Sequence, residues 1–266
     1  MSSLKILFYI IILELFLGCG TVQTSQIEDN STNIVASEIN SSQNIEDGTL
    51  FTFVSTPLLQ EPTNYIDKFI NDDNCNQILD KDFLVICYDY NLKSAKSVAY
   101  TLEGDLVNEL NIQERPEFYE EELIDEAYRA KSSDYSGSGY DRGHMAPDAS
   151  FDWSQESLEA TYSLANIIPQ VPEVNRYMWA NVEAYARDKA VELGKIDVVN
   201  VIRYDNNNLN RIGEDNIAIS IGYYKILFNR DELYEECFYY ANNLSINIED
   251  DNLSRHKVNC RNIATR

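Results

Sequence analysis

Histidine and basic residues are scarce in this sequence. The chain has 266 residues but only two histidines, His144 and His256, and its 21 Lys+Arg face 44 Asp+Glu, a formal net charge of −23. Two histidines exclude a zinc site built from several of them. The acidity excludes a basic protein that coats nucleic acid. Any catalysis by histidine must therefore use one of these two side chains.

Apolar residues, in contrast, are plentiful. Hydrophobic residues make up 44% of the chain and aromatic residues 11%, which is enough for a hydrophobic core and excludes a fully disordered or collagen-like chain. At about 100–200 residues per domain, the length predicts one large domain or two small ones.

The N-terminus has the pattern of an export signal. Lys5 precedes an apolar run over residues 6–17, which only Glu14 interrupts. A bilayer span needs about 20 residues, so the run predicts a signal peptide over residues 1–18 rather than a membrane helix. A small residue and then Cys19 follow the run, which resembles the lipobox of bacterial lipoproteins and implies lipidation of Cys19. An ordinary cleaved signal peptide with an incidental cysteine is the alternative.

The segment after Cys19 is polar. It is rich in Ser, Thr, Asn, Gln and acidic residues, with few apolar ones and no clear period. This composition predicts a solvated tether. We therefore expect a lipidated N-terminus and disordered tether over residues 19–49 and a folded domain over residues 50–266. The protein is expected to be exported, and either anchored to a membrane or free in the periplasm or outside the cell.

Four cysteines remain beyond Cys19, namely Cys75, Cys87, Cys237 and Cys260. An even number in an exported chain favours two disulfides, and three pairings exist. We favour the bonds between neighbours in sequence, 75 with 87 and 237 with 260. Four free buried thiols are the alternative, and no CxxC pattern or histidine cluster supports zinc.

Hydrophobic patterning predicts strands on both sides of a helical centre. Strands are expected at 83–90, 97–102, 196–204, 217–228 and 236–240, and helices at 154–166 and about 173–193. Residues 132–139, SSDYSGSG, predict a flexible loop. This order of elements favours the α+β class.

Residues 141–183 hold the groups best suited to chemistry. Arg142 and His144 are two apart, so on a strand they share one face. Asn175 and Glu183 are eight apart on one expected helix, about 80° from each other at 3.6 residues per turn. Trp179 lies midway between them and is expected to pack in the core. The segment thus offers a base, a cationic clamp and oxygen ligands suited to Mg²⁺.

Each residue alone also has an ordinary structural interpretation. His144 would be a structural histidine, and Arg142 would pair with Asp141 on the surface. Asn175 would cap a helix, and Glu183 would be a solvated helix residue. Only the combination favours a catalytic site.

Together, three sequence blocks resemble the DNA/RNA non-specific endonucleases, the endonuclease G-like members of the ββα-metal nucleases. The blocks are DRGHMAP at 141–147, NIIPQ at 166–170, and Asn175 spaced from Trp179 and Glu183. The resemblance implies a ββα-metal nuclease fold, with a central, mostly antiparallel sheet flanked by helices.

The resemblance also implies a role for the catalytic base and for the metal. His144 matches the general base that activates water. Asn175 matches the ligand of a single Mg²⁺, with Mn²⁺ as an alternative ion, and Glu183 matches the acid that holds metal-bound waters.

Three further residues match supporting positions of the family. Arg142 matches the arginine on the phosphate side, Asn166 a supporting amide near the histidine, and Arg115 the second arginine. Asp148 departs from the pattern, because many members carry a small residue there.

These roles imply hydrolysis of phosphodiester bonds in DNA and RNA without sequence specificity, leaving 5′-phosphate and 3′-hydroxyl ends. Nucleic acid is the expected partner, with a membrane through the lipid anchor, and a homodimer is allowed because many relatives form dimers. A catalytically inactive nuclease fold that serves as a surface binding lipoprotein is one alternative, and a purely structural lipoprotein is another. The acidity is a difficulty, because binders of nucleic acid usually neutralise phosphates with Lys and Arg.

Overall fold

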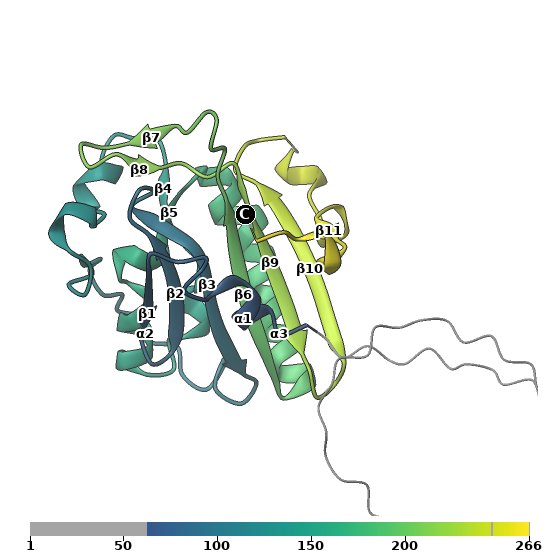
Figure 1. Cartoon of the computed structure of the whole chain (residues 1–266). Helices are drawn as coiled ribbons and strands as arrows, with labels where there is room; N and C mark the ends of the chain where they lie inside the picture. Colours follow the sequence, from purple (N-terminus) through teal and green to yellow (C-terminus); the bar gives the residue numbers. More distant parts are fainter. Residues whose placement is uncertain (1–62, 246, 266) are drawn as a thin grey trace, which may run out of the picture. The chain divides into compact units, whose positions relative to one another are not determined.

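The computed structural model describes residues 63–245 and 247–265 (Figure 1). The predicted signal peptide, Cys19 and the tether lie outside the described residues. In the described part of the chain, no helix is long and apolar enough to cross a membrane.

The helical elements are mostly short. The α-helices are α1 (Tyr65–Phe69), α2 (Gln155–Thr161) and α3 (Ala180–Leu193), and a π-helix (Val174–Trp179) runs directly into α3. Single 3-10 turns lie at Glu126–Tyr128, Ser132–Tyr135, Asp148–Ser150, Leu164–Asn166, Ile248–Asp250, Leu253–Arg255 and Cys260–Asn262.

Eleven strands are present among the described residues. They are β1 (Gln77–Asp80), β2 (Leu84–Asp89), β3 (Ser94–Glu103), β4 (Asp141–His144), β5 (Ile167–Gln170), β6 (Lys195–Arg203), β7 (Arg211–Ile212), β8 (Ile217–Ala218), β9 (Gly222–Asn229), β10 (Tyr234–Ala241) and β11 (Lys257–Val258). Seven of them form one sheet in the order β1-β2-β3-β6-β9-β10-β11, and every pairing in it is antiparallel. Strands β4 and β5 form a separate pair, as do β7 and β8. The α+β class with a mostly antiparallel sheet is therefore confirmed.

The large sheet is covered on both faces, with α3 on one side and the short α1 on the other (Figure 1). Successive strand residues point to opposite faces, so each strand contributes to two cores. On β3, Val98 and Tyr100 belong to the cluster that includes Trp179 of the π-helix. Ala99, between them, belongs to the cluster with Phe69 of α1. Burial on both faces explains why these strands read as nearly continuous apolar runs.

Two disulfides join the predicted pairs, Cys75 with Cys87 and Cys237 with Cys260. The first ties the segment after α1 to β2, and the second ties β10 to the C-terminal turn. All four residues lie in or against the core on the α1 side of the sheet.

The expectation of one continuous strand over 217–228 is wrong. The chain forms β8 and β9 with a break between them, because β8 pairs with β7 while β9 pairs with β6 and β10. At the break, the amide of Asn242 donates to the Ser220 carbonyl over 3.0 Å, which holds the bend.

The expected helix over 154–166 is shorter than predicted. It starts as expected, with Ser154 as its cap, but α2 ends at Thr161. Ser163 then bonds Glu121, and a 3-10 turn leads into β5. Packing against the 119–121 segment therefore ends a helix that its periodicity alone would continue.

Residues 132–139 are not simply an open loop. The segment begins with a 3-10 turn in which Asp134 and Tyr135 are buried. The Asp134 carboxylate accepts hydrogen bonds from the backbone of Lys131 and of Asp215, each over 3.0 Å. The local bond from Lys131 and the bond from the distant Asp215 order a segment whose small polar residues predict flexibility.

Candidate active site

Strands β4 and β5 and the helix that follows them form a ββα unit. In the antiparallel pair, Asp141 lies opposite Gln170 and His144 opposite Ile167. The pairing requires glycine at 143, because a Cβ there would overlap the buried side chain of Gln170. The first two sequence blocks are therefore the two strands of one pair.

The helix that carries the third block is attached to β4 at two points. The Asn175 amide donates to Asp141 Oδ2 over 3.1 Å, and the Trp179 indole donates to the carbonyl oxygen of His144 over 3.3 Å. Trp179 is also buried, as predicted. Asn175 and Glu183 are thereby held on an element that contacts both ends of the histidine strand.

The uniform α-helix expected over 173–193 is corrected by the structure. Residues 174–179 form a π-helix, and only residues from Ala180 onward are α-helical. The 80° separation calculated for Asn175 and Glu183 at 3.6 residues per turn therefore does not apply. Such bulges often occur at functional sites. Asn175 does not cap the helix, because its side chain bonds Asp141 instead.

The ring of His144 lies in an aromatic environment. Phe118 and Tyr162 pack on it with ring centroids 5.4 and 5.0 Å away. Burial lowers the pKa of His144 to about 4, while Asp148 acts to raise it and Arg115 to lower it further. Its Nε2 atom is buried and has no hydrogen-bond partner among the described residues. The imidazole is thus neutral near pH 7, as a general base must be.

The other histidine has a structural environment. His256 is buried, with Nε2 2.6 Å from Asp251 and Nδ1 3.0 Å from the Tyr239 carbonyl oxygen. Its ring stacks on Tyr240 at 3.8 Å. Both nitrogens are therefore engaged within the C-terminal part of the chain, which leaves His144 as the candidate base.

Arg142 and His144 share a neighbour, as expected for alternate residues of one strand. The Arg142 guanidinium lies 5.6 Å from the centroid of Phe118, which also packs on His144. One amino group donates to the Ser132 carbonyl over 2.7 Å. The alternative that Arg142 pairs with Asp141 is wrong, because Arg176 takes that carboxylate with bonds of 2.7 and 2.8 Å.

Asn166 holds the backbone directly after His144. Its Oδ1 accepts from the Ala146 amide over 2.9 Å, and its Nδ2 donates to the Ala146 and Thr161 carbonyls over 2.9 and 2.8 Å. The side chain is fully buried, so each of these bonds replaces one that water would otherwise make. This places the predicted supporting amide beside the histidine strand.

Glu183 is partly buried, and two cationic side chains act on its carboxylate. Burial raises its pKa to about 7, while the charges of Lys225 and Arg187 act to lower it and Asp148 to raise it. The alternative of a freely solvated Glu183 is therefore wrong. Its carboxylate responds to groups from three different elements.

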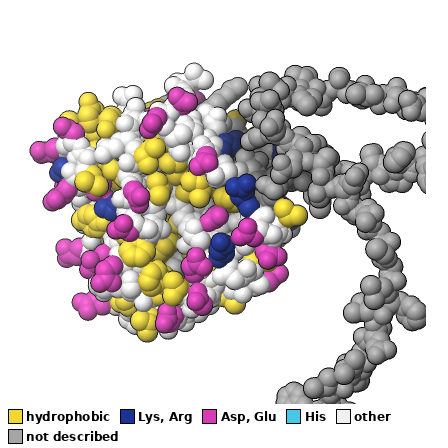
Figure 2. All heavy atoms as spheres, turned by 60° about the horizontal axis from the view of Figure 1, so that its bottom comes forward, with side chains coloured by type: hydrophobic (Ala, Val, Ile, Leu, Met, Phe, Trp, Pro, Cys, Tyr) yellow, Lys and Arg dark blue, Asp and Glu magenta, His cyan; other side chains and the backbone are white. Residues whose placement is uncertain are grey.

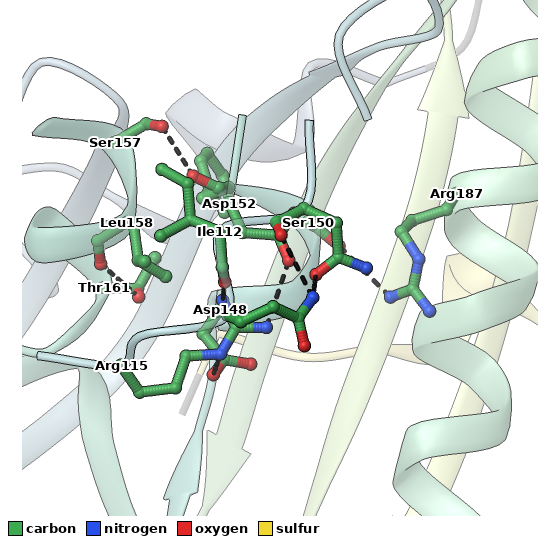
Figure 3. Close-up of polar contacts among 12 residues, drawn as sticks. Ile112, Arg115, Asp148, Ser150, Asp152, Ser157, Leu158, Thr161 and Arg187 are labelled. Atoms are coloured by element: carbon green, nitrogen blue, oxygen red, sulfur yellow. Dashed lines mark hydrogen bonds and ion pairs between the residues drawn. The ribbon is translucent and has the colours of Figure 1, made fainter. Parts of the chain in front are cut away.

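Arg115 is held by two carboxylates (Figure 3). Its Nε lies 3.3 Å from Asp148 Oδ2, and its amino group donates to Asp152 Oδ2 over 3.0 Å. A further bond of 2.8 Å joins it to the Ile112 carbonyl. Asp148 also accepts from the Tyr162 hydroxyl over 2.9 Å, which links this cluster to the ring that packs on His144.

Three charged residues near the site were missed in the sequence. Arg176 binds Asp141, and Arg187 on α3 reaches Ser150 over 3.4 Å (Figure 3). Lys225 is fully buried in β9, where it donates to Tyr100 and Asn200 over 3.1 and 3.0 Å. Arg187 is one helical turn after Glu183, which is a usable signal. Nothing local distinguishes Lys225, because it becomes buried only through the sheet.

The donor set fits a hydrated divalent cation. The Asn175 Nδ2 is engaged by Asp141, which leaves Oδ1 without a hydrogen bond among the described residues. Oxygen ligands of this kind suit Mg²⁺, which keeps several waters. Within residues 63–245 and 247–265, no group of three or more His, Cys, Asp or Glu side chains could hold a metal. A site with one amide ligand and an outer carboxylate is consistent with that finding.

A histidine strand in a two-stranded pair, docked on a helix with an amide and a carboxylate, defines the ββα class of nuclease folds. The chain belongs to the DNA/RNA non-specific endonuclease family, whose model matches residues 62–266.

Individual relatives match a smaller part of the chain. Mitochondrial endonuclease G of Homo sapiens is 35% identical over 111 residues, which are 42% of this chain and 37% of that protein. A nuclease of Nostoc sp. is 32% identical over 132 residues, 49% of this chain and 47% of that protein. These matches therefore span less than half the length of each relative.

A solved structure shows the same fold. The crystal structure of an EndoG/EndoGI complex, which concerns the inhibition of EndoG, contains a chain that superposes with a TM-score of 0.61. The match covers 69% of this chain and 80% of that one, at 22% sequence identity.

Proposed function

We propose that this protein is a Mg²⁺-dependent endonuclease that hydrolyses phosphodiester bonds of DNA and RNA to 5′-phosphate and 3′-hydroxyl ends. The observation that supports this most strongly is the joining of the histidine strand to the Asn175 helix by the Asp141 and Trp179 hydrogen bonds. A base and a set of oxygen ligands are thus held on one connected unit.

In this proposal the residues of the chain divide the work. His144, neutral because burial lowers its pKa, takes the proton of the attacking water. Asn166 and Trp179 keep its backbone in place through the bonds to Ala146 and to the His144 carbonyl. Arg187 and Arg142 supply positive charge beside the cleaved phosphate.

Asn175 Oδ1 would hold the cation directly, and Glu183 would hold it through water. When bound, Mg²⁺ or Mn²⁺ would polarise the phosphoryl oxygens and stabilise the leaving oxygen. A neutral amide ligand leaves the charge of the ion undiminished for the phosphate. The positive charge of the ion matters because the protein itself is acidic. The face shown in Figure 2 carries many acidic and few basic side chains.

The test is cleavage of plasmid DNA and of RNA by the purified protein, with Mg²⁺ or with EDTA. We expect metal-dependent nicking, and a loss of about 10²–10⁴-fold in His144→Ala, the range for removing a general base. Asn175→Ala should lower turnover and raise the Mg²⁺ concentration needed for half-maximal cleavage, whereas Asn181→Ala, at an exposed position of α3, should behave like wild type. A protein that folds and binds nucleic acid but never cuts it would support the inactive binding module instead.

We also propose an exported, lipid-anchored location through Cys19, supported by the resemblance to a lipobox. Metabolic labelling with a fatty acid tests it. A Cys19→Ser chain that still fractionates with membranes would contradict the anchor.

A further inference from the structure

Asp148 stands directly beside the predicted catalytic groups. It starts the 3-10 turn after β4 and is four residues beyond His144. Its Oδ2 contacts the Arg115 guanidinium at 3.3 Å and accepts the Tyr162 hydroxyl at 2.9 Å. Tyr162 in turn packs its ring against that of His144. The carboxylate therefore lies at the edge of the site.

The two carboxylates on Arg115 differ in how they are held. Asp152 is 5% exposed and binds the guanidinium at 3.0 Å, so this carboxylate is enclosed by protein. Asp148 is 29% exposed, and Arg115 is 34% exposed. Asp148 is thus the more exposed of the two carboxylates on Arg115, and the one that an incoming anion can more readily replace. Asp152 would keep Arg115 in place if Asp148 moved away.

The charge of Asp148 acts on both His144 and Glu183. After burial, it is the largest influence on the pKa of His144, and it also acts to raise the pKa of Glu183. A carboxylate close enough to affect both residues is also close enough to repel a phosphate between them.

We propose that Asp148 occupies the phosphate position on Arg115 and competes with the nucleic-acid backbone for it. This inference rests on the proposed nuclease function and assigns a residue that limits substrate affinity. A phosphate that binds Arg115 must displace the Asp148 carboxylate, while Asp152 holds the guanidinium from the buried side. Asp148 is therefore an internal competitor of the substrate.

Binding without cleavage tests the proposal. In the His144→Ala background, the Kd of a fluorescent single-stranded oligonucleotide is measured by anisotropy in Mg²⁺, with and without Asp148→Asn. The variant keeps an acceptor for Tyr162 but removes the charge. We expect Kd to fall by about tenfold, which corresponds to about 1.4 kcal/mol.

The salt dependence gives a second readout that a merely structural role would not change. If Arg115 becomes free to bind one more phosphate, the slope of log affinity against log salt should steepen by about 0.7 for a single strand. Asp188→Asn is the matched control, because Asp188 is exposed on α3 and has no hydrogen bond or ion pair within the described residues. This control removes the same charge. It should change Kd and the salt slope much less than Asp148→Asn does.

An unchanged or raised Kd in Asp148→Asn, with an unchanged salt slope, overturns the proposal, and so does an effect equal to that of Asp188→Asn. Thermal unfolding shows whether each variant folds, and Asp148→Ser provides a second substitution. Plasmid cleavage by wild-type protein is measured in parallel. Cleavage without the expected change in affinity would overturn only this inference, whereas a wild type that never cleaves would contradict the nuclease function.

Discussion

At the residue scale, the site depends on a histidine whose surroundings oppose its charged form. Phe118 and Tyr162 pack on the ring, and no carboxylate hydrogen-bonds to it among the described residues. Burial is the dominant cause of the low pKa, since the opposing charge of Asp148 only reduces the shift. The same surroundings that keep the base neutral must therefore cost stability in acid.

This predicts a pH-dependent stability difference between wild type and His144→Gln. Burial lowers the pKa of His144 from 6.5 to about 4, so between these pH values the unfolded chain binds a proton that the folded chain does not. Wild type should lose stability relative to the variant as the pH falls through this window, by up to about 3 kcal/mol. Urea unfolding in EDTA at several pH values measures the difference. A difference that stays constant from pH 7.5 to 4 would contradict the burial of the ring.

At the element scale, the close approach of β4 and β5 determines the position of His144. Gly143 lies between Arg142 and His144, opposite Ile168, and its missing side chain leaves room for Gln170. The strand has only four residues and no other sheet partner. Its geometry therefore depends on this contact and on the Asn166 hydrogen bonds.

We predict that Gly143→Ala destabilises the protein by about 1–3 kcal/mol, the usual cost of overpacking a core. It should also reduce cleavage, because the overlap displaces the residue next to His144. Denaturant unfolding and plasmid nicking measure the two effects. In a Gln170→Ala background the added methyl has space, so the double-mutant cycle should show a smaller cost. Equal costs in both backgrounds would mean that Gln170 does not set the spacing.

At the scale of the whole molecule, the net charge of −23 opposes an anionic substrate. The region around the site is less acidic, with six basic and nine acidic residues between 128 and 190. The basic groups there, such as Arg187, would lie near the phosphate of a substrate bound as proposed, whereas the charges of more distant acidic groups are screened beyond about 8–10 Å at ordinary salt. Added salt should therefore weaken the attraction at local contacts, and it should also weaken the long-range repulsion that opposes the encounter.

We predict that the association rate of an oligonucleotide with His144→Ala protein rises several-fold (~3–10) as monovalent salt increases from low to physiological concentration at fixed Mg²⁺. Screening weakens the repulsion that slows the encounter. Stopped-flow anisotropy measures the rate constant. A rate that falls with salt, as for basic nucleases, would show that a local positive field controls the encounter instead.

Much of the architecture was predictable from local patterns. Runs such as 83–90 and 196–204 are strands because their apolar residues are buried on both faces, and the short spacing of each cysteine pair favoured the bonds that form. The break at 219–221 was not predictable, because Ile217 and Ile226 look alike in sequence. The break arises because Ile217 pairs with β7 whereas Ile226 pairs with β6.

The spacing of the motifs along the chain predicts that a base, an amide and an acid act together. Their charges and their neighbours depend on how the chain folds. The π-helix, the pairing of Asp141 with Arg176 and the burial of Lys225 all arise between segments far apart in the chain. The ion pairs of Arg115 with Asp148 and Asp152 also join separate segments of the chain. Desolvation and ion pairing depend on distance in space, which spacing along the chain does not contain.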